Sequence, residues 1–513
     1  MLWGKLNRAL RAMIMMLQRA VKGHLNLRAA LFSLAMIVSL LFAIKALCLI
    51  DRSSLWGDEL RTVIKAFQPS VLFIFDYLKT DSHPPLYYLM LWGWGQSVGQ
   101  SAISLRLFSW LAYLVGGILM ITQAAGLARC RARAVAFAAL LAFCTPFPVR
   151  FSIEGKGYAL LVAMLALALL IRRLILDRAS FRPTLIIAYG LAVALASLTH
   201  YYGFGLICAL LFWDGLRRRW SLVFAAFIGI VPSSLWIIYS SGHLFNPSTN
   251  RWIAPPEFSL LSNTLIRALG VYPFWKLGGL ILLILALNSW GHRKRFMEVL
   301  DADARSGLNQ LLDRSGIWGG CVLVLIVMGL SYLKPIAFSR YFVVLVPVLV
   351  PALAAAAADW SLRYRGEWFA LVILTMVVLH YWHAAFVDIN PPQGEFRRER
   401  SDFRSVSLRL ADESWRYADR SILFNASDQM LVAAGSLKSN QKPWGDKDDL
   451  LSRLTQGNSP EQFYLAASGR KSKMNKRLND LKVISDQNGY QCFQLDDLPR
   501  GAMVLNCQQK THP

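Results

Sequence analysis

The chain has 513 residues, of which 55% are hydrophobic and only 17% are charged. Because soluble globular domains carry about 25% charged residues, this composition excludes a soluble protein and indicates several membrane spans. The formal net charge of +24 would suit a nucleic-acid partner. Basic residues that lie between apolar spans follow the positive-inside rule instead, so we expect no nucleic-acid partner.

The first elements set the orientation of the chain. Residues 1–28 carry basic side chains and no acids, which predicts a cytoplasmic amphipathic helix at the membrane surface. Ala29–Ile50 is long enough to cross outward, and we interpret it as an uncleaved signal anchor. Pro84–Gln96 begins with two prolines and is too short to cross, so we expect it in the membrane interface. Ile103–Leu127 then runs inward and places the basic loop after it in the cytoplasm.

Later apolar runs alternate with basic loops and bring the total to about 11 crossings. These runs are Ala134–Val149, Gly155–Leu176, Pro183–Thr199, Tyr201–Leu216, Trp220–Ser240, Val271–Trp290, Ile317–Leu333, Pro335–Ala358 and Trp368–Phe386. Arginine clusters mark their predicted inner ends, at 172–173, 217–219, 292–295 and 363–365. The sequence therefore predicts an α-helical polytopic domain over residues 29–386 in the cell inner membrane, with a cytoplasmic N-terminus.

Residues 387–513 are polar and charged, and by the same count they lie outside the cytoplasm. Strand-like runs alternate with helix-like ones, which predicts a small C-terminal α/β domain. The strand-like runs are 421–424, 462–468, 490–495 and 502–507, and the helix-like runs are 402–414 and 428–437. Cys492 and Cys507 are the two cysteines of this domain. In an oxidising compartment they could form a disulfide or stay free.

Ionisable and aromatic residues gather at the predicted outer ends of the spans. They are Asp58, Glu59, Arg61, Asp81, His83, Glu154, Lys156, His200, Tyr201, Tyr202, Arg251, Lys334, Arg340 and Tyr341. Charged groups at membrane depth are costly and usually face one another or a cavity, so their concentration on one side indicates a site. For any one of the basic or aromatic residues the alternative is an interfacial side chain or a helix cap.

Carboxylates beside several cations, without a nucleotide-binding loop, suit a particular chemistry. A lipid-linked phosphate donor supplies its own anchor and leaving group, so the protein needs cations for the phosphate and a base for the acceptor hydroxyl. This reaction is glycosyl transfer from a polyprenyl-phosphate sugar. No Walker or GxGxxG loop and no zinc-spaced cluster occurs, so no cofactor is required.

Several segments resemble a known family in their order along the chain. They are DE (Asp58, Glu59), DSHPPLYYLML (Asp81–Leu91), FSIEGKGYALL (Phe151–Leu161), LTHYYG (Leu198–Gly203) and SRYFVVLVPVL (Ser339–Leu349). Over residues 30–390 this layout resembles membrane glycosyltransferases of the C fold (GT-C), in the branch related to protein O-mannosyltransferases and the lipid A aminoarabinose transferase. The resemblance implies a GT-C fold and an extracytoplasmic transfer of a hexose or pentose.

The resemblance also implies residue roles. Asp58 resembles the catalytic aspartate that accepts the acceptor's proton in a single inverting displacement, and Glu154 is the second carboxylate. Residues at the donor-phosphate positions are Arg61, His83, Lys156, Arg340 and Tyr341. His83 stands where the aminoarabinose transferase has a lysine, and histidine is cationic only part of the time near neutral pH.

The remaining polar residues have less defined roles. We assign Asp81, His200, Tyr201 and Arg251 to sugar or acceptor binding. We group Glu59 with the catalytic carboxylates Asp58 and Glu154; it could orient the acceptor or bind a cation, and the alternative is that it faces water. A divalent cation on Asp58 and Glu154 stays open, because Ser82 replaces a glutamate that helps to hold a metal in the aminoarabinose transferase.

Rival functional classes are a flippase or transporter of the lipid-linked sugar, without transferase chemistry, and a non-catalytic scaffold. Transporters are expected to show internal repeats and charges deep within several spans, and the sequence shows neither. Expected partners of a transferase are the polyprenyl-phosphate sugar, membrane lipids and an acceptor. The sequence does not identify the sugar, or decide whether the acceptor is a glycan, a lipid or a protein.

Overall fold

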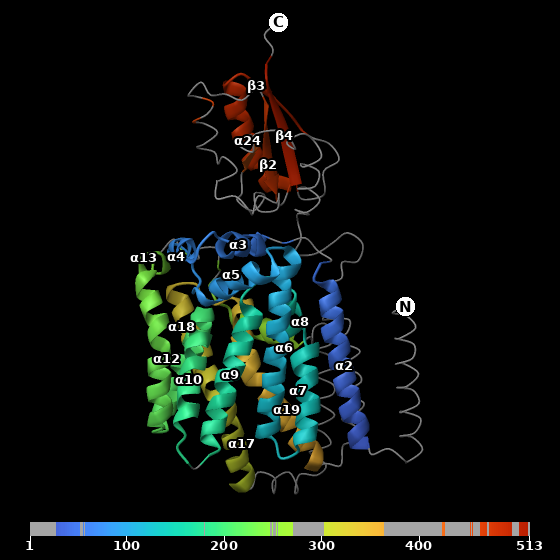
Figure 1. The fold of residues 1–513 in the computed structure, drawn as a ribbon, viewed down its shortest axis with the longest axis vertical. Helices are drawn as coiled ribbons and strands as arrows, with labels where there is room; N and C mark the ends of the chain where they lie inside the picture. The colour runs from blue at the N-terminus through green and yellow to red at the C-terminus, as the bar shows by residue number, and fades with distance from the viewer. Residues whose placement is uncertain are drawn as a thin grey trace. The chain divides into compact units, whose positions relative to one another are not determined.

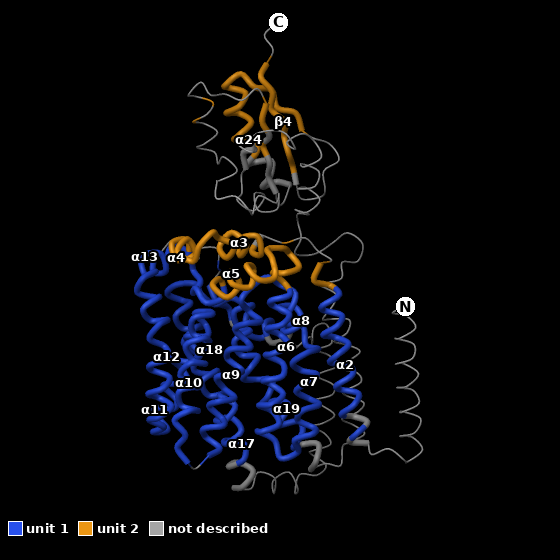
Figure 2. The backbone as a smooth tube through the Cα atoms, viewed as in Figure 1, with its two compact units in different colours: residues 1–48, 78–87, 107–387 blue, residues 49–77, 88–106, 388–513 orange. Residues whose placement is uncertain are grey.

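The computed structural model describes residues 27–51, 57–178, 180–246, 255–269, 302–363, 423–425, 462–468, 471–494 and 502–510, together with residues 55, 249, 253, 452 and 454. The chain divides into two compact units, which Figure 2 distinguishes by colour. Unit 1 comprises residues 1–48, 78–87 and 107–387, and unit 2 comprises residues 49–77, 88–106 and 388–513. Each unit is described by itself.

Unit 1 is a bundle of helices (Figure 1). Its helices, two of which extend into unit 2 at one end, are α2 (Leu27–Leu49), α6 (Ala102–Leu127), α7 (Arg131–Cys144), α8 (Pro146–Ser152), α9 (Tyr158–Leu176), α10 (Pro183–Thr199), α11 (Tyr201–Leu216), α12 (Trp220–Tyr239), α13 (Ser241–Leu244), α14 (Phe258–Leu269), α17 (Ala302–Ser315), α18 (Ile317–Leu333), the 3-10 helix η1 (Ser339–Leu345) and α19 (Val346–Arg363). Helix α19 packs on α7 and α9, α10 packs on α9 and α12, and α11 packs on α18.

Among the described helices, five are long and apolar enough to cross a membrane, or up to seven if each of two bent pairs counts as one span. The bends are 54° between α7 and α8 and 61° between α17 and α18. Pro146 stands at the first bend, where its ring cannot continue helix α7. Gly316 stands at the second, with a φ of 84° that favours glycine. The predicted α-helical polytopic architecture is confirmed; the expected crossings 271–290 and 368–386 lie outside the described residues.

Small residues let the helices of unit 1 approach closely. A Cβ atom on Gly229 of α12 would lie 2.5 Å from the carbonyl oxygen of Gly190 on α10. A Cβ atom on Gly117 of α6 would lie 2.2 Å from the ring of Phe143 on α7. Membrane helices associate through such close packing, because lipid tails are as apolar as the helix faces. Glycine at these positions therefore sets the spacing of the bundle.

A buried network of charges joins the helix ends on one side of unit 1. The Arg172 guanidinium on α9 is fully buried and donates to both carboxylate oxygens of Asp214 on α11, at 2.6 and 2.8 Å. It also donates to the main-chain oxygen of Asp313 on α17 at 2.8 Å. Arg219, just before α12, bonds to the carboxylates of both aspartates. The arginines expected at the headgroup level thus include one, Arg172, that is held inside the protein.

Unit 2 contains three short segments of helix before the C-terminal residues. Helix α3 (Gly57–Ala66) is followed by α4 (Val71–Lys79) and α5 (Leu86–Val98), whose ends fall partly in unit 1. The Trp92 indole on α5 donates to the carbonyl of Gln68 at 2.9 Å, which fixes the chain directly after α3. Helix α5 has 13 residues and is not among the candidate membrane spans of the described chain.

The C-terminal part of unit 2 forms a four-stranded sheet in the order β1-β2-β4-β3. Its strands are β1 (Leu423–Asn425), β2 (Gln462–Ser468), β3 (Tyr490–Gln494) and β4 (Ala502–Gln509). Strand β1 pairs with β2 in parallel, and β4 pairs antiparallel with β2 and β3. All four strands overlap the strand-like runs expected from the sequence. The expected helices 402–414 and 428–437 lie outside the described residues.

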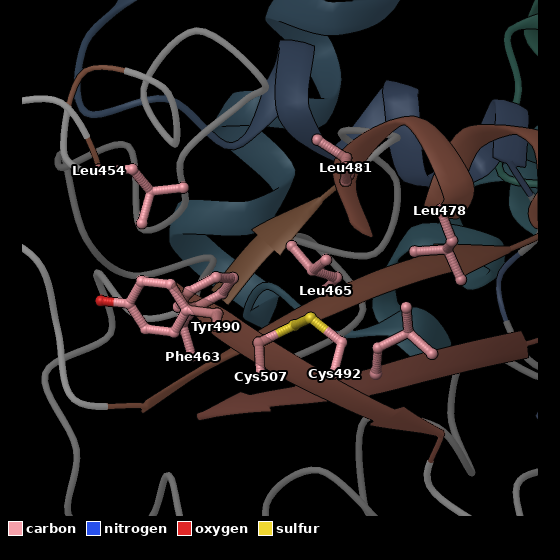
Figure 3. Packing of buried hydrophobic residues seen from close by; sticks show 9 residues of the cluster. Leu454, Phe463, Leu465, Leu478, Leu481, Tyr490, Cys492 and Cys507 are labelled. Atoms are coloured by element: carbon pink, nitrogen blue, oxygen red, sulfur yellow. A yellow bond between two sulfur atoms is a disulfide. The ribbon is translucent and has the colours of Figure 1, made fainter. Parts of the chain in front are cut away.

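Helix α24 (Lys471–Gln487) packs on this sheet and was not expected from the sequence. Its apolar residues Leu478 and Leu481 enter a core with Phe463, Leu465 and other buried side chains (Figure 3). The same core contains a disulfide between Cys492 and Cys507, which stand directly opposite each other on β3 and β4. The cross-link therefore joins the edge strand to its neighbour.

Candidate functional site

Four connections of unit 1 meet at one end of the bundle and supply the candidate site. They follow α4, precede α9, join α10 to α11 and lead from α18 into η1. The residues they contribute are Asp81, His83, Glu154, Lys156, His200, Arg340 and Tyr341. Helix α17, which carries part of the buried arginine network, lies at the other end of the bundle from α13 (Figure 1).

His200 is the centre of this cluster. It is buried, with an exposed fraction of 8%. Its ring centroid lies 5.2 Å from that of Tyr341, 5.7 Å from Tyr202, 6.0 Å from Tyr158 and 6.3 Å from His83. His200 is also the N-cap of α11, because its Nδ1 accepts the N–H of Tyr202 at 3.1 Å. This bond requires Nδ1 to be unprotonated.

The electrostatics of the cluster keep His200 neutral. Burial first, and then the charges of His83, Lys156 and Arg340, lower the pKa of its imidazole to about 3. Cations from three separate connections therefore act on one ring. With His200 neutral at pH 7, the positive charges that act on its ring come from the other three groups.

His83 pairs with an acid on its own loop. Its Nδ1 lies 2.5 Å from Oδ1 of Asp81, and the two side chains are partly exposed, at 26% and 18%. Pro84 and Pro85 follow at once and are both buried. Proline fixes its own φ and restricts the residue before it, so the loop presents His83 with little backbone freedom.

Glu154 and Lys156 flank a tight turn before α9. Both are buried, and Oε2 of Glu154 lies 3.7 Å from Nε of Arg150 on α8. The main-chain oxygen of Lys156 accepts from the Ser109 hydroxyl at 3.5 Å. Between Lys156 and α9 stands Gly157, where a Cβ would lie 3.1 Å from the Tyr87 ring. A side chain at position 157 would therefore crowd the Tyr87 ring of α5.

Arg340 and Tyr341 are held by the start of η1. The Ser331 hydroxyl accepts from the N–H groups of Ile336 and Ala337, each at 2.8 Å, and fixes the connection after α18. The Arg340 guanidinium lies 4.9 Å from the centroid of the Phe338 ring, a cation–π contact. Tyr341, next in sequence, packs against the His200 ring.

The acids of the first loop lie in unit 2. Asp58 is half-buried in the first turn of α3, and Arg61 on the same helix is exposed. Glu59 is fully buried and receives two bonds from Arg106, Nε at 2.8 Å and Nη2 at 2.6 Å. The alternative that Glu59 faces water is therefore wrong, because a buried carboxylate needs a charged partner and Arg106 supplies it.

The contacts of the His200 ring described above do not include two other expected site residues, Tyr201 and Arg251. The Tyr201 hydroxyl lies 3.4 Å from the Ser240 hydroxyl at the end of α12. Arg251 lies outside the described residues.

Several residues that complete these sites were not expected from the sequence. They are Arg106, Arg150, Tyr158 and Phe338. For Arg106 and Arg150 a signal existed: each is an arginine in an otherwise apolar stretch, and such a charge needs an acidic partner.

A divalent cation on Asp58 and Glu154 stays a prediction. Among the described residues, no group of three or more His, Cys, Asp or Glu side chains is placed to hold one. In unit 1, Oε2 of Glu154 lies 3.7 Å from Nε of Arg150, and the positive charge of this guanidinium would repel a metal cation at that place. We therefore derive no step through a metal at this residue.

No family model and no curated protein matches the chain. Solved structures do. The apo structure of ArnT from Cupriavidus metallidurans superposes with a TM-score of 0.60 at 14% identity, covering 92% of this chain and 97% of ArnT. The ArnT structure bound to undecaprenyl phosphate gives a TM-score of 0.56 at the same identity and coverage. The chain has the GT-C fold. The GT-C likeness extends over nearly the whole length of both chains and so includes more than the helical bundle.

Proposed function

We propose that this GT-C protein is a membrane glycosyltransferase that moves a sugar from a polyprenyl-phosphate donor to an acceptor hydroxyl. The observation that carries the proposal is the grouping of His83, Lys156 and Arg340 around the neutral His200 at one end of an apolar bundle. Positive groups gathered at the end of an apolar bundle attract an anionic ligand, and a phosphate group carries the charge and the oxygens to meet them.

A lipid-linked phosphate is the anion that suits such a place. Its prenyl chain dissolves in the membrane, and its phosphate stops at the headgroup level, where loops at the helix ends can reach it. Lys156 supplies a compact ammonium charge, and Arg340 supplies a planar guanidinium that can donate parallel hydrogen bonds. The two side chains together can hold several phosphate oxygens. The ArnT structure with undecaprenyl phosphate shows that this fold accommodates a lipid phosphate.

The reaction is a single displacement at the anomeric carbon. The acceptor oxygen attacks, its proton passes to the Asp58 carboxylate, and the bond from carbon to the phosphate oxygen breaks with inversion. Charge that grows on the leaving phosphate is stabilised by cations already in position. Asp58 stands in the first turn of α3, where the N-terminus of a helix stabilises negative charge.

We place this chemistry on the extracytoplasmic face of the inner membrane. Support comes from the arginine-rich ends of two helices of unit 1. Arg172 and Arg173 lie near the C-terminal end of α9, and Arg217–Arg219 follow the C-terminal end of α11. Two of the site connections lie at the N-terminal ends of these two helices. By the positive-inside rule the arginine-rich ends are cytoplasmic. The C-terminal sheet and its disulfide then lie outside, where disulfides persist.

The test is transfer from labelled donor by purified protein. Undecaprenyl-phosphate hexoses and pentoses, each tritiated in the sugar, are incubated with the protein and an extract of envelope acceptors, and label in the acceptor fraction is counted. Wild type transfers from one donor class, and Asp58→Asn lowers the rate by about 10³-fold because the base is lost. The matched control is Asp76→Asn, an exposed acid on α4, which leaves the rate unchanged. Equal rates for wild type and Asp58→Asn would exclude the proposed base.

A further inference from the structure

The pair formed by Asp81 and His83 offers chemistry that the other cations of the site lack. Nδ1 of His83 lies 2.5 Å from the Asp81 carboxylate. A carboxylate accepts hydrogen bonds and cannot donate them when ionised, so the proton between the two groups is donated by Nδ1. Nε2 is then the ring nitrogen that can exchange a proton with a ligand.

The surroundings of His83 hold three other titratable or charged groups, each from a different connection. His200 stands edge-on at 6.3 Å between centroids and is neutral, so it donates no charge. Lys156 and Arg340 act with positive charge on the ring of His200, the neighbour of His83. Asp81 opposes them and stabilises an imidazolium at His83, since a carboxylate in contact favours the charged form of a histidine.

Lysine and arginine can bind a phosphate but cannot give it a proton near neutral pH. Their ordinary pKa values are about 10 and above 12, whereas that of histidine is about 6.5. A phosphate monoester, which the departing lipid phosphate becomes, takes up its second proton with a pKa of about 6. The imidazole and the phosphate monoester thus have similar pKa values, which is the condition for efficient general acid catalysis.

We propose that His83 is a general acid that protonates the departing lipid phosphate, with Asp81 as the residue that positions it; this inference rests on the proposed function. The bond from acceptor oxygen to anomeric carbon forms as the bond from that carbon to the phosphate oxygen breaks. The bonding electrons go to the phosphate oxygen, which takes the proton from Nε2 of His83. The acceptor's proton goes to Asp58. The lipid phosphate leaves as a monoanion, and both side chains are reset by proton exchange with water.

The first experiment separates proton donation from phosphate binding. His83→Lys keeps a cation, but its ordinary pKa of about 10 makes it a poor proton donor near neutral pH, and His83→Gln is neutral and does not titrate. We expect His83→Lys to keep the donor KM within about threefold, to lower kcat at least about tenfold, and to lose the fall in kcat that wild type shows on the alkaline side. We expect His83→Gln to lower kcat about 100-fold and to raise KM as well. Wild-type kcat and an unchanged alkaline limb in His83→Lys would overturn the inference.

The second experiment addresses Asp81. Asp81→Asn keeps an acceptor for Nδ1 but removes the negative charge that favours the imidazolium. The alkaline limb of kcat then moves to lower pH, while the donor KM stays the same. An alkaline limb at the wild-type position would contradict the positioning role.

The two proposals fail in distinguishable ways. Absence of transfer by wild type would overturn the proposed function itself. Transfer by wild type that depends on Asp58 but is indifferent to His83→Lys would overturn the His83 inference alone. Each variant is first checked for a wild-type melting temperature, so that loss of folding is not read as loss of catalysis.

Discussion

His200 shows how a single neutral residue can organise a positively charged site. Its ring fills the space between Tyr158, Tyr202 and Tyr341, and its Nδ1 caps α11. A lysine or arginine in this place would add a fourth positive charge, and an apolar residue would leave the Tyr202 N–H without its cap. Histidine provides a ring, an acceptor and no charge.

The depressed pKa of His200 makes stability depend on pH. Between about 6.5 and about 3 the unfolded chain binds a proton at this residue and the folded chain does not. Stability is therefore complete above pH 6.5 and falls on acidification, by up to about 1.4 kcal/mol per pH unit. His200→Asn keeps an N-cap acceptor without titrating, so its melting temperature should decline less steeply below pH 6.5. Parallel declines in detergent-solubilised wild type and variant would contradict this.

Individual site residues were predictable to different degrees. His83, Lys156, His200, Arg340 and Tyr341 were expected to meet, because polar residues at the outer ends of apolar spans have few other places to go. Their mutual order around His200 was not predictable, since it depends on which helix ends are neighbours. Nor could the sequence show that Glu59 turns inward, because its partner is 47 residues away.

At the scale of elements, helix α3 is held at both ends within unit 2. Arg106, near the start of α6, donates two hydrogen bonds to the Glu59 carboxylate and a third to the carbonyl of Ile50 at 2.8 Å. At the other end, the Trp92 indole bonds to the Gln68 carbonyl. A helix fixed at both ends has little freedom to rotate, so these bonds set the direction of Asp58.

The buried ion pair between Glu59 and Arg106 predicts that a single variant loses more stability than a double variant. Glu59→Ala leaves the Arg106 guanidinium, which is 3% exposed, without its carboxylate. Removing one member of a buried ion pair costs about 3 to 5 kcal/mol, so the melting temperature in detergent should fall sharply. The double variant Glu59→Leu with Arg106→Met removes both charges and should recover most of the loss. A double variant no more stable than Glu59→Ala would contradict this explanation.

Elements differ in how far the sequence predicts them. Apolar runs such as Pro183–Thr199 and Tyr201–Leu216 have the same bounds in the structure, because a long hydrophobic stretch has one stable conformation in lipid. Helix α24 was missed because most of its residues are polar and only a narrow stripe, including Leu478 and Leu481, enters the core. The bend at Gly316 depends on a single positive φ, which composition does not reveal.

At the scale of the whole molecule, the two ends of unit 1 use charge in opposite ways. Arg172 and Arg219 at one end are paired with Asp214 and Asp313 in a network that joins α9, α11, α12 and α17. Such pairing leaves these arginines no capacity to attract a ligand and suits a structural role. At the other end His83, Lys156 and Arg340 act on the neutral ring of His200, the arrangement on which the proposed phosphate site rests. An acid inside the apolar stretch of α11, Asp214, was the sequence signal for the first arrangement.

The most direct test of the account is the affinity of the purified protein for undecaprenyl phosphate. Charged hydrogen bonds to a phosphate are worth about 1.5 to 3 kcal/mol each, so Lys156→Ala and Arg340→Ala should each raise the Kd about 10- to 100-fold. The control is Arg217→Ala, an arginine that is 52% exposed and ends α11 away from the site. We predict a wild-type Kd for this control. Wild-type affinity in Lys156→Ala and Arg340→Ala would contradict a phosphate site around His200.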